Sequence, residues 1–284
     1  MPVLWTMMNF ETQKRFKLAA IDLDGTLLGP AHDISPANLQ AIQRLQGAGA
    51  QVVLASGRHY NSMLKYAQAL PGLQWIVSCQ GGEVSDVNRT NVLGRTFMSS
   101  ADVKKTMDLG RALGFATVAY TVDGVVTDSQ SDQEMDFYTD LAGHRPMVLK
   151  TADLLARDMF KVIWMGDPAA LSRLSLADIA APSVQAIRTN ARFLEFMPTA
   201  ASKGSALELL AAHLGIAASD AVVFGDGDND IPMFEWAGTS VAMPHGWPQA
   251  IRSAKHVAPA GPAETAFARA VDLVLQPAPE CVPV

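Results

Sequence analysis

Two aspartates, Asp22 and Asp24, stand where an apolar run ends and a Gly-Thr turn begins. The run from Leu18 to Ile21 is typical of a buried strand, which should deliver both carboxylates into one small space. Paired carboxylates repel one another and burial adds a desolvation cost, so such a pair normally holds a cation or a proton between its members. An Asp-Gly turn is also a common solvated surface feature, so further motifs are needed to decide between the two interpretations.

Two more predicted strands end in polar residues. The strand Gln51 to Ala55 is followed by Ser56-Gly57-Arg58, and the strand Ala221 to Phe224 is followed by the acidic run Gly225 to Asp230. In an open parallel sheet, ligands bind outside the carboxyl ends of the strands. Carboxylates, a hydroxyl and glycine turns should therefore line one edge of this sheet, which weakens the surface-turn interpretation.

The chemistry of these groups favours magnesium and a phosphoryl group. Magnesium prefers carboxylate oxygens, water and substrate phosphate, and no His-rich or Cys-rich cluster argues for zinc or copper. Ser56 and the backbone N–H groups of the glycine turn can hold a phosphate oxygen, and Lys203 adds positive charge at a helix start. The chain lacks the P-loop and the dinucleotide-binding glycine motif, so a nucleotide is not required.

A carboxylate in such a site can act as a nucleophile. It can attack a phosphoryl group to give an aspartyl phosphate, which water then hydrolyses. Two carboxylates at this spacing can divide the work, because metal binding keeps one ionised while the other exchanges a proton. The spacing alone does not say which carboxylate does which.

The elements that position these residues follow two patterns. Strands and helices alternate up to residue 83, as in a parallel sheet covered on both faces. The next part reads as helices and two hairpins, with one helix over Pro168 to Ile179, and suggests an antiparallel sheet with helices on one face. The first pattern resumes with a helix at Lys203, and Thr239 to Ala242 is expected to be the final strand before a Pro-rich tail.

The predicted fold class is therefore α/β, a doubly wound parallel-sheet core with an inserted α+β cap domain. We expect residues 1–83 and 199–284 to form the core and residues 84–198 to form the cap. One domain would thus be built from both ends of the chain, with the other inserted into it.

Composition excludes several classes of partner. The net charge of -6 gives no general attraction to nucleic acid or to an anionic membrane surface. No stretch reaches the ~18 apolar residues of a membrane helix, and Met1 to Phe10 lacks the features of a signal peptide. Cys79 follows a predicted strand and Cys281 lies in the Pro-rich tail, so the two cysteines suggest neither a disulfide framework nor a zinc cluster. This cysteine usage fits a reducing compartment, and we expect a cytoplasmic protein.

Four motifs in order resemble the haloacid dehalogenase (HAD) superfamily and, more narrowly, its Cof-type phosphatases. The resemblance covers nearly the whole chain, from about Phe16 to Leu275. Its motifs are Asp22 to Thr26, Ala55 to Arg58, Ser202 to Leu207 and Gly225 to Met233. The resemblance implies a HAD-like Rossmannoid core, and a cap that closes over the core and contributes substrate contacts.

The resemblance also assigns catalytic and metal roles. It implies that Asp22 is the nucleophile and that Asp24 is the general acid and base, while Lys203 stabilises the transferring group. It implies that magnesium is held by the Asp22 carboxylate, the Asp24 backbone carbonyl and Asp226, with Asp230 assisting nearby. The order of the two aspartates, left open by spacing, comes from the family.

Phosphate contacts are implied in the same way. Ser56 and Gly57 match the phosphate-binding turn, Lys203 matches the phosphate-contacting lysine, and Asn229 matches a residue that orients phosphate or Asp22. Two departures from the family pattern lie near the expected mouth of the site: Gln80 replaces a common Asn, and the stretch Met243 to Gly246 replaces Met-x-Asn-Ala. Leaving-group preference can therefore differ from that of relatives.

The sequence thus predicts a magnesium-dependent phosphatase that hydrolyses a small phosphorylated metabolite through an aspartyl phosphate at Asp22. One alternative is a phosphomutase of sugar phosphates with the same core. Another is a non-catalytic phosphate-binding protein, which the intact Asp22, Asp24, Lys203 and Asp226 argue against. Sugar phosphates, phosphorylated cofactors and nucleotides all fit a core that reads only the phosphoryl group, and no feature indicates an oligomeric state.

Overall fold

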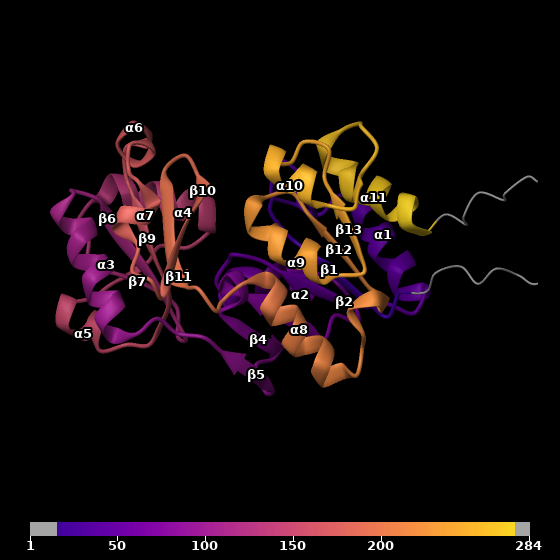
Figure 1. Ribbon diagram of the computed structural model, residues 1–284, viewed down its shortest axis with the longest axis horizontal. Helices are drawn as coiled ribbons and strands as arrows, with labels where there is room; N and C mark the ends of the chain where they lie inside the picture. Colours follow the sequence, from indigo (N-terminus) through magenta and orange to yellow (C-terminus); the bar gives the residue numbers. More distant parts are fainter. Residues whose placement is uncertain (1–15, 276–284) are drawn as a thin grey trace, which may run out of the picture.

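The computed structural model describes residues 16–275 and contains two sheets with their own helices (Figure 1). The strands of the larger sheet are β1 (Leu18–Ile21), β2 (Gln51–Ala55), β3 (Trp75–Ser78), β4 (Glu83–Asp86), β5 (Val92–Arg95), β12 (Ala221–Gly225), β13 (Thr239–Ala242) and β14 (His256–Val257). Their order is β14-β13-β12-β1-β2-β3-β4-β5, parallel from β14 to β3 and antiparallel at β4 and β5. Cys281 and the first ten residues lie outside the described part.

Helices cover both faces of the larger sheet. They are α1 (Pro36–Gly47), α2 (Tyr60–Gln68), α8 (Lys203–Leu214), α9 (Ile231–Trp236), α10 (Pro248–Ser253) and α11 (Ala266–Leu275). Short 3-10 turns lie between them at η1 (Cys79–Gly81), η2 (Ala218–Asp220), η3 (Asp228–Asp230) and η4 (Ala263–Thr265). Ala19 and Ile21 of β1 pack with α1, α2 and α11, whereas Leu18 and Ala20 pack with α8, α9 and α10. This alternation is why an uninterrupted apolar run forms a central strand.

The C-terminal part of the chain differs from the sequence expectation. Thr239–Ala242 is not the final strand, because β14 and α11 follow it. The helix α11 packs against α1 and buries Phe267 and Val271 in the core. Phe267 and Val271 lie one helical turn apart, which is typical of a helix with one buried face. The Pro and Gly residues on both sides of this short segment favoured the interpretation as a tail instead.

The second sheet has six strands, and we call this sheet and its helices the cap, and the rest of the described chain the core. The cap strands are β6 (Ala116–Thr121), β7 (Val125–Thr127), β8 (Met147–Val148), β9 (Met159–Met165), β10 (Val184–Asn190) and β11 (Phe193–Pro198). Their order is β10-β11-β9-β6-β7-β8, antiparallel except for the parallel pair β7 and β8. The cap sheet lies on the left in Figure 1 and the core on the right.

Two expectations about the cap helices were wrong. The cap helices are α3 (Ser100–Ala112), α4 (Asp132–Ala142), α5 (Thr151–Leu155), α6 (Pro168–Ser172) and α7 (Leu176–Ile179). Residues of α3, α5 and α6 pack on one face of the sheet with Trp164, but α4 packs on the other face with Ile163 and Phe193. The predicted helix Pro168–Ile179 is divided into α6 and α7, where Arg188 donates to the carbonyl oxygens of Leu171 and Leu174.

The predicted domain limits of 1–83, 84–198 and 199–284 stay a prediction, and strand pairing bears on the first limit. β4 pairs with β3 and β5 pairs with β4, so both strands extend the larger sheet beyond residue 83. We propose that the chain enters the cap after Arg95, where β5 ends. Across residues 16–275, no helix has the length and apolar character needed to cross a membrane.

Candidate active site

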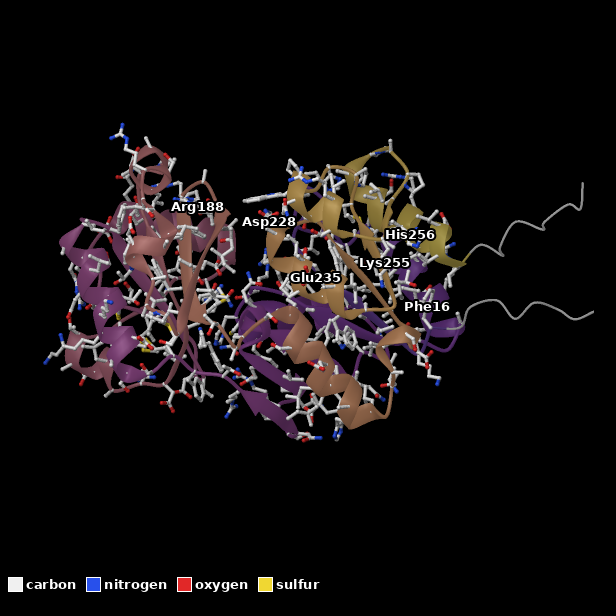
Figure 2. All side chains as sticks on the ribbon, in the orientation of Figure 1. Phe16, Arg188, Asp228, Glu235, Lys255 and His256 are labelled. Carbon is white, nitrogen blue, oxygen red and sulfur yellow. The ribbon has the colours of Figure 1, made fainter. Side chains whose placement is uncertain are left out.

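A cavity of about 260 Å³ lies between the core and the cap, at the carboxyl ends of the central core strands. Asp22, Ser56 and Asp226 directly follow β1, β2 and β12, and all three line it. Arg188 of the cap and Asp228 of the core also line the cavity, and Figure 2 labels them on either side of the boundary between the two parts. The parallel register therefore brings the sequence motifs to one edge, as predicted.

A buried charge network lies at the floor of this cavity. The Lys203 ammonium lies 2.5 Å from Asp22 Oδ1 and 2.5 Å from Asp230 Oδ1, and its side chain has no exposed surface. A capping box between Ser202 and Ser205 starts α8 at Lys203 and so fixes where the ammonium reaches. Lys203 balances one of the two carboxylates that it contacts, so the network keeps an excess of negative charge.

Asp226 and Asp230 are held by the turn that follows β12. Asp230 Oδ2 accepts hydrogen bonds of 2.9 Å from the backbone N–H groups of Asp226 and Gly227. Thr26 Oγ1 donates to Asp226 Oδ1 over 3.3 Å, which ties the first motif to the fourth. Gly25 has φ +78°, and a Cβ there would lie 2.3 Å from Asp226 Oδ2, so this position requires glycine.

The carboxylates at the floor could hold a metal ion. One oxygen from each of Asp22, Asp226 and Asp230 lies within 4.8 Å of the others, and we call these three residues with Lys203 the carboxylate cluster. Burial and the charges of Asp230 and Asp226 raise the pKa of Asp22 well above its usual value, although Lys203 opposes the shift. Burial and the charge of Asp230 raise the pKa of Asp226 to about 7. These uncompensated oxygens suit a hard divalent cation.

Asp24 lies in different surroundings from Asp22. Arg58 donates to both of its carboxylate oxygens over 2.7 Å, and His32 Nδ1 lies 3.5 Å from Asp24 Oδ1. Burial tends to raise the pKa of Asp24, but the hydrogen bonds and charge of Arg58 outweigh it and the pKa is lowered. The Asp24 side chain thus stands apart from the carboxylate cluster, and the predicted metal contact through its backbone carbonyl stays a prediction.

The predicted phosphate-binding residues fall into two groups. Ser56, Gly57 and Asn229 line the cavity, and the backbone N–H of Arg58 donates to Ser56 Oγ over 3.2 Å. Lys203 does not lie on the cavity wall, because its ammonium is held between Asp22 and Asp230. The predicted contact of Lys203 with phosphate therefore stays a prediction, whereas its contact with Asp22 is direct.

Both departures from the family pattern contact the motifs. Gln80 Oε1 accepts a 3.0 Å hydrogen bond from Asn229 Nδ2, and a Cβ on Gly57 would lie 2.4 Å from Gln80 Nε2. Gln80 thus packs between the second and fourth motifs, with its backbone at φ 62°. His245 Nε2 lies 2.8 Å from the carbonyl oxygen of Gly25, in the turn after Asp24.

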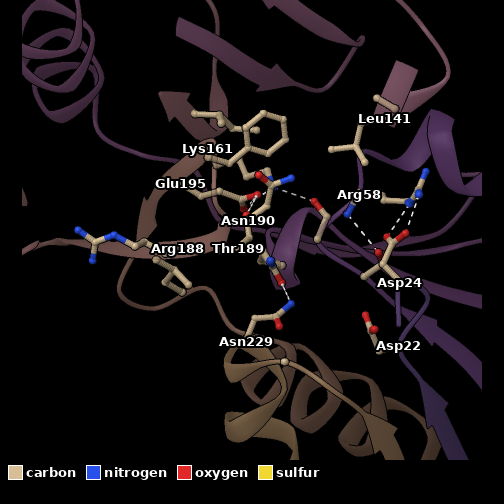
Figure 3. A pocket seen from close by; sticks show the side chains of 18 of the residues that line it. Asp22, Asp24, Arg58, Leu141, Lys161, Arg188, Thr189, Asn190, Glu195 and Asn229 are labelled. Carbon is tan, nitrogen blue, oxygen red and sulfur yellow. Dashed lines mark hydrogen bonds and ion pairs between the residues drawn. The ribbon is translucent and has the colours of Figure 1, made fainter. Parts of the chain in front are cut away.

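None of the site residues predicted from the sequence belongs to the cap, yet cap residues line the cavity. Figure 3 shows Lys161, Glu195, Thr189 and Asn190 on the cap side of the cavity, opposite Asp22 and its neighbours. Lys161 donates to Glu195 Oε2 over 2.6 Å and to the carbonyl oxygen of Gly57 over 2.8 Å. Lys161 is the one charged residue of the apolar strand Met159–Met165, and Glu195 is the one charged residue of Phe193–Pro198. Single charges in apolar strands indicate a buried ion pair, and this pattern could have identified the two residues from the sequence.

Comparisons with known proteins agree with this geometry. The model of the haloacid dehalogenase-like hydrolase family matches residues 19–269. The HMP-PP phosphatase of Serratia proteamaculans is 29% identical over 237 residues, which cover 82% of this chain and 86% of the relative. A solved Bacteroides thetaiotaomicron structure, the HAD phosphatase BT1666, is 22% identical with a TM-score of 0.79, covering 95% of this chain and 98% of that one.

The HAD subclass IIB sugar phosphatase BT4131 is similar in structure as well. Its TM-score is 0.80 at 18% identity, covering 90% of this chain and 98% of that chain. At this level of identity the likeness establishes the fold, and the predicted doubly wound core with an inserted cap is confirmed.

Proposed function

The chain belongs to the haloacid dehalogenase-like hydrolases, and on that premise we propose that it is a magnesium-dependent phosphatase of a small phosphorylated metabolite. The reaction would pass through an aspartyl phosphate on Asp22. The relatives named phosphatase support this class of activity. The motif resemblance on which the family was predicted is confirmed by the family match.

The surroundings of Asp22 support this proposal most directly. Its carboxylate lines the cavity at the end of β1, touches Lys203, and shares the carboxylate cluster with Asp226 and Asp230. A surface turn would have solvated aspartates, whereas Asp22 is buried and charge-paired. Such a carboxylate is held ready to act as a nucleophile toward a phosphoryl group above it.

Magnesium fits the carboxylate cluster on the chemistry of its donors. Three carboxylates with one balancing lysine leave a local excess of negative charge, which a divalent cation would offset. We propose that Asp22, Asp226 and the Asp24 backbone carbonyl hold the ion, with Asp230 assisting. A bound magnesium ion supplies neutralisation of the charge on the transferring phosphoryl group.

The side chains then have separate tasks. Asp22 attacks phosphorus and the bond to the ester oxygen breaks, with Asp24 giving its proton to the departing alcohol. In the second step Asp24 takes a proton from the water that hydrolyses the aspartyl phosphate. The Arg58 pair keeps Asp24 ionised, which suits the second step, so the pair has to open for the first.

Release of inorganic phosphate from p-nitrophenyl phosphate tests the proposal. We expect turnover with magnesium and loss of turnover in EDTA that magnesium restores. A panel of phosphorylated metabolites under the same conditions would then identify the substrate class. Absence of hydrolysis with every ester, in protein shown to be folded, would contradict the proposed function and leave the binding-protein alternative. Isomerised sugar phosphate in place of free phosphate would instead identify a phosphomutase.

A further inference from the structure

The turn from Ser56 to Arg58, where the sequence predicts phosphate contacts, is held partly by the core and partly by the cap. We call these residues the Ser56 turn. The carbonyl oxygens of its first and last residues accept backbone hydrogen bonds of 3.0 and 2.9 Å from the 3-10 turn Cys79–Gly81 of the core. The carbonyl oxygen between them, on Gly57, accepts instead from the Lys161 ammonium of the cap over 2.8 Å. The core therefore fixes two of the three carbonyl groups, and the cap fixes the third.

The Gly57 carbonyl is linked to the Ser56 hydroxyl through one peptide group. The backbone N–H of Arg58 belongs to that peptide, so the carbonyl and the N–H are oriented together. The N–H donates to Ser56 Oγ over 3.2 Å, and Ser56 lines the cavity. Because Ser56 Oγ accepts this bond, its own proton is available to a ligand oxygen. Glycine leaves its backbone dihedrals unrestricted, so the orientation of the peptide depends on its hydrogen bonds.

The Lys161 ammonium is held in place within the cap. Its side chain is 1% exposed, and it donates to Glu195 Oε2 over 2.6 Å. Thr189 Oγ1 donates to the other Glu195 oxygen over 2.9 Å, and the ammonium lies 4.4 Å from the centre of the Tyr120 ring. These residues come from four neighbouring strands of the cap sheet, β6, β9, β11 and β10. The ammonium is therefore a donor whose position follows that of the cap.

We propose that Lys161 is a positioning residue for phosphate binding, which acts through the Gly57–Arg58 peptide to direct the Ser56 hydroxyl at the phosphate. This inference rests on the proposed function, because it assumes that a phosphoryl group is bound at Ser56. The donor belongs to the cap and the carbonyl to the core, so contact between the two parts completes the phosphate site. Lys161 itself is given no contact with the substrate.

Binding of inorganic phosphate in the presence of magnesium tests the proposal, because this probe has no leaving group that could contact the cap. Calorimetry measures its Kd in a double-mutant cycle. All four proteins of the cycle carry Glu195→Gln, which removes the carboxylate that Lys161→Met would otherwise leave buried and unpaired. They are this background alone, the background with Ser56→Ala, the background with Lys161→Met, and the background with both. Circular dichroism establishes that each protein is folded.

The two substitutions should not act independently. In the Glu195→Gln background we expect Lys161→Met to raise the Kd about fivefold and Ser56→Ala to raise it about tenfold, the range of one hydrogen bond to an anion. Once Ser56→Ala is present, Lys161→Met should raise the Kd by less than about twofold, because the hydroxyl through which it acts is gone.

Additive effects would overturn the proposal. A lysine that is merely structural, or one that touches phosphate directly, would give the same rise with and without the Ser56 hydroxyl. An unchanged Kd in the Lys161→Met protein would overturn the proposal as well. If Lys161→Met fails to fold in this background, Lys161→Gln replaces it in the cycle. Its amide can still donate to residue 195, but its side chain is too short to reach the Gly57 carbonyl as well.

Asn61→Ala is the matched control for loosening of the cap. Asn61 Nδ2 also donates from the core to a cap carbonyl oxygen, that of Asp123 over 3.5 Å, but it makes no hydrogen bond to the Ser56 turn. Its phosphate Kd should equal that of the unchanged protein. A rise as large as that of Lys161→Met would assign the effect to cap loosening and overturn the positioning role.

Hydrolysis of p-nitrophenyl phosphate by the same proteins lets the two proposals fail separately. Non-additive phosphate binding without hydrolysis would support the positioning role and overturn the phosphatase proposal. Hydrolysis with additive effects on phosphate binding would overturn the positioning role alone. Absence of phosphate binding by the unchanged protein would overturn the positioning role whatever the hydrolysis assay shows.

Discussion

Two carboxylates two residues apart in the chain have opposite surroundings. Asp22 is buried against Lys203 and Asp230, whereas the Asp24 side chain is 44% exposed and bound by Arg58. Burial raises the pKa of Asp22, whereas the Arg58 pair lowers that of Asp24. Each carboxylate contacts a cation and both follow the same strand, so the comparison teaches that burial and neighbouring carboxylates are what distinguish Asp22 from Asp24 and would underlie the proposed division of work.

Replacing the two carboxylates one at a time is the strongest test of this comparison. We expect Asp22→Asn to lower kcat by at least roughly 10⁴-fold on every ester, since it removes the nucleophile. We expect Asp24→Asn to lower kcat more on an alkyl phosphate than on p-nitrophenyl phosphate, because p-nitrophenolate leaves without a proton. Initial rates on both esters measure the difference.

The intermediate provides a control for that test. With p-nitrophenyl phosphate, Asp24→Asn should accumulate acid-stable label on Asp22, because the base of the second step is missing. Asp33→Asn, at an exposed aspartate in the loop after the motif, should leave the rates unchanged. Equal losses on both esters for Asp24→Asn, without trapped label, would contradict the separation of roles.

The second test concerns the cation of the carboxylate cluster. Lys203→Met leaves Asp22 and Asp230 buried without their shared partner, so we expect a loss of about 3–5 kcal/mol in the free energy of unfolding without magnesium. Urea unfolding followed by circular dichroism measures this loss. Lys104→Met is the matched control, because its partner Asp108 and its own ammonium are exposed and the change should be under about 1 kcal/mol.

The sequence predicted the core wall of the cavity better than the cap wall. Asp22, Ser56 and Asp226 follow strands whose apolar runs are readable, and parallel strands bring their carboxyl ends to one edge whatever the loops do. Lys161 and Glu195 meet because β9 and β11 pair antiparallel in one particular register. That register depends on turn geometry and on packing with other strands, which a single sequence leaves open.

The same limit applies to the partners of the charged residues. Lys203 follows a readable N-cap, but which oxygens its ammonium reaches depends on the distance between α8 and β1, and it reaches Asp22 and Asp230 rather than the cavity wall. Arg58 was readable as part of a motif, yet its pairing with Asp24 required side-chain geometry. Sequence motifs therefore identified the charged residues of the site, whereas packing determined which of these residues pair with one another.

A third test concerns the contact between the cap and the core segment that carries Arg58, the partner of Asp24. His59, next to Arg58, is buried, and its Nε2 lies 2.9 Å from the carbonyl oxygen of Thr121 in the cap. Burial lowers the pKa of His59 to about 4, so the unfolded chain binds more protons than the folded one between pH 6.5 and 4. The stabilisation is present above pH 6.5 and is lost as pH falls toward 4.

We expect the free energy of unfolding to fall by about 2 kcal/mol from this residue between pH 7 and pH 5. Urea unfolding at the two pH values measures the fall. His59→Gln should remove this part of the pH dependence, and His256→Gln, at an exposed histidine, should keep it. The same pH dependence in both variants would show that His59 is not the group responsible.

The smallest expected effect comes from Arg58, and it sharpens the comparison between the two carboxylates most directly. Arg58→Met removes the two 2.7 Å hydrogen bonds to Asp24 but touches none of the carboxylate cluster, so Asp24 should lose its fixed orientation while Asp22 keeps its own. We expect kcat on p-nitrophenyl phosphate, whose departure needs no proton from Asp24, to fall by about tenfold, the size of one charge-assisted pair, because hydrolysis of the aspartyl phosphate needs Asp24 ionised and held in place. Arg58→Lys, which keeps the charge but cannot bind both oxygens in the same plane, should recover only part of the loss. Recovery to the full rate would mean that charge alone matters at Asp24, whereas no loss in Arg58→Met would show that Asp24 works independently of the pair that distinguishes it from Asp22.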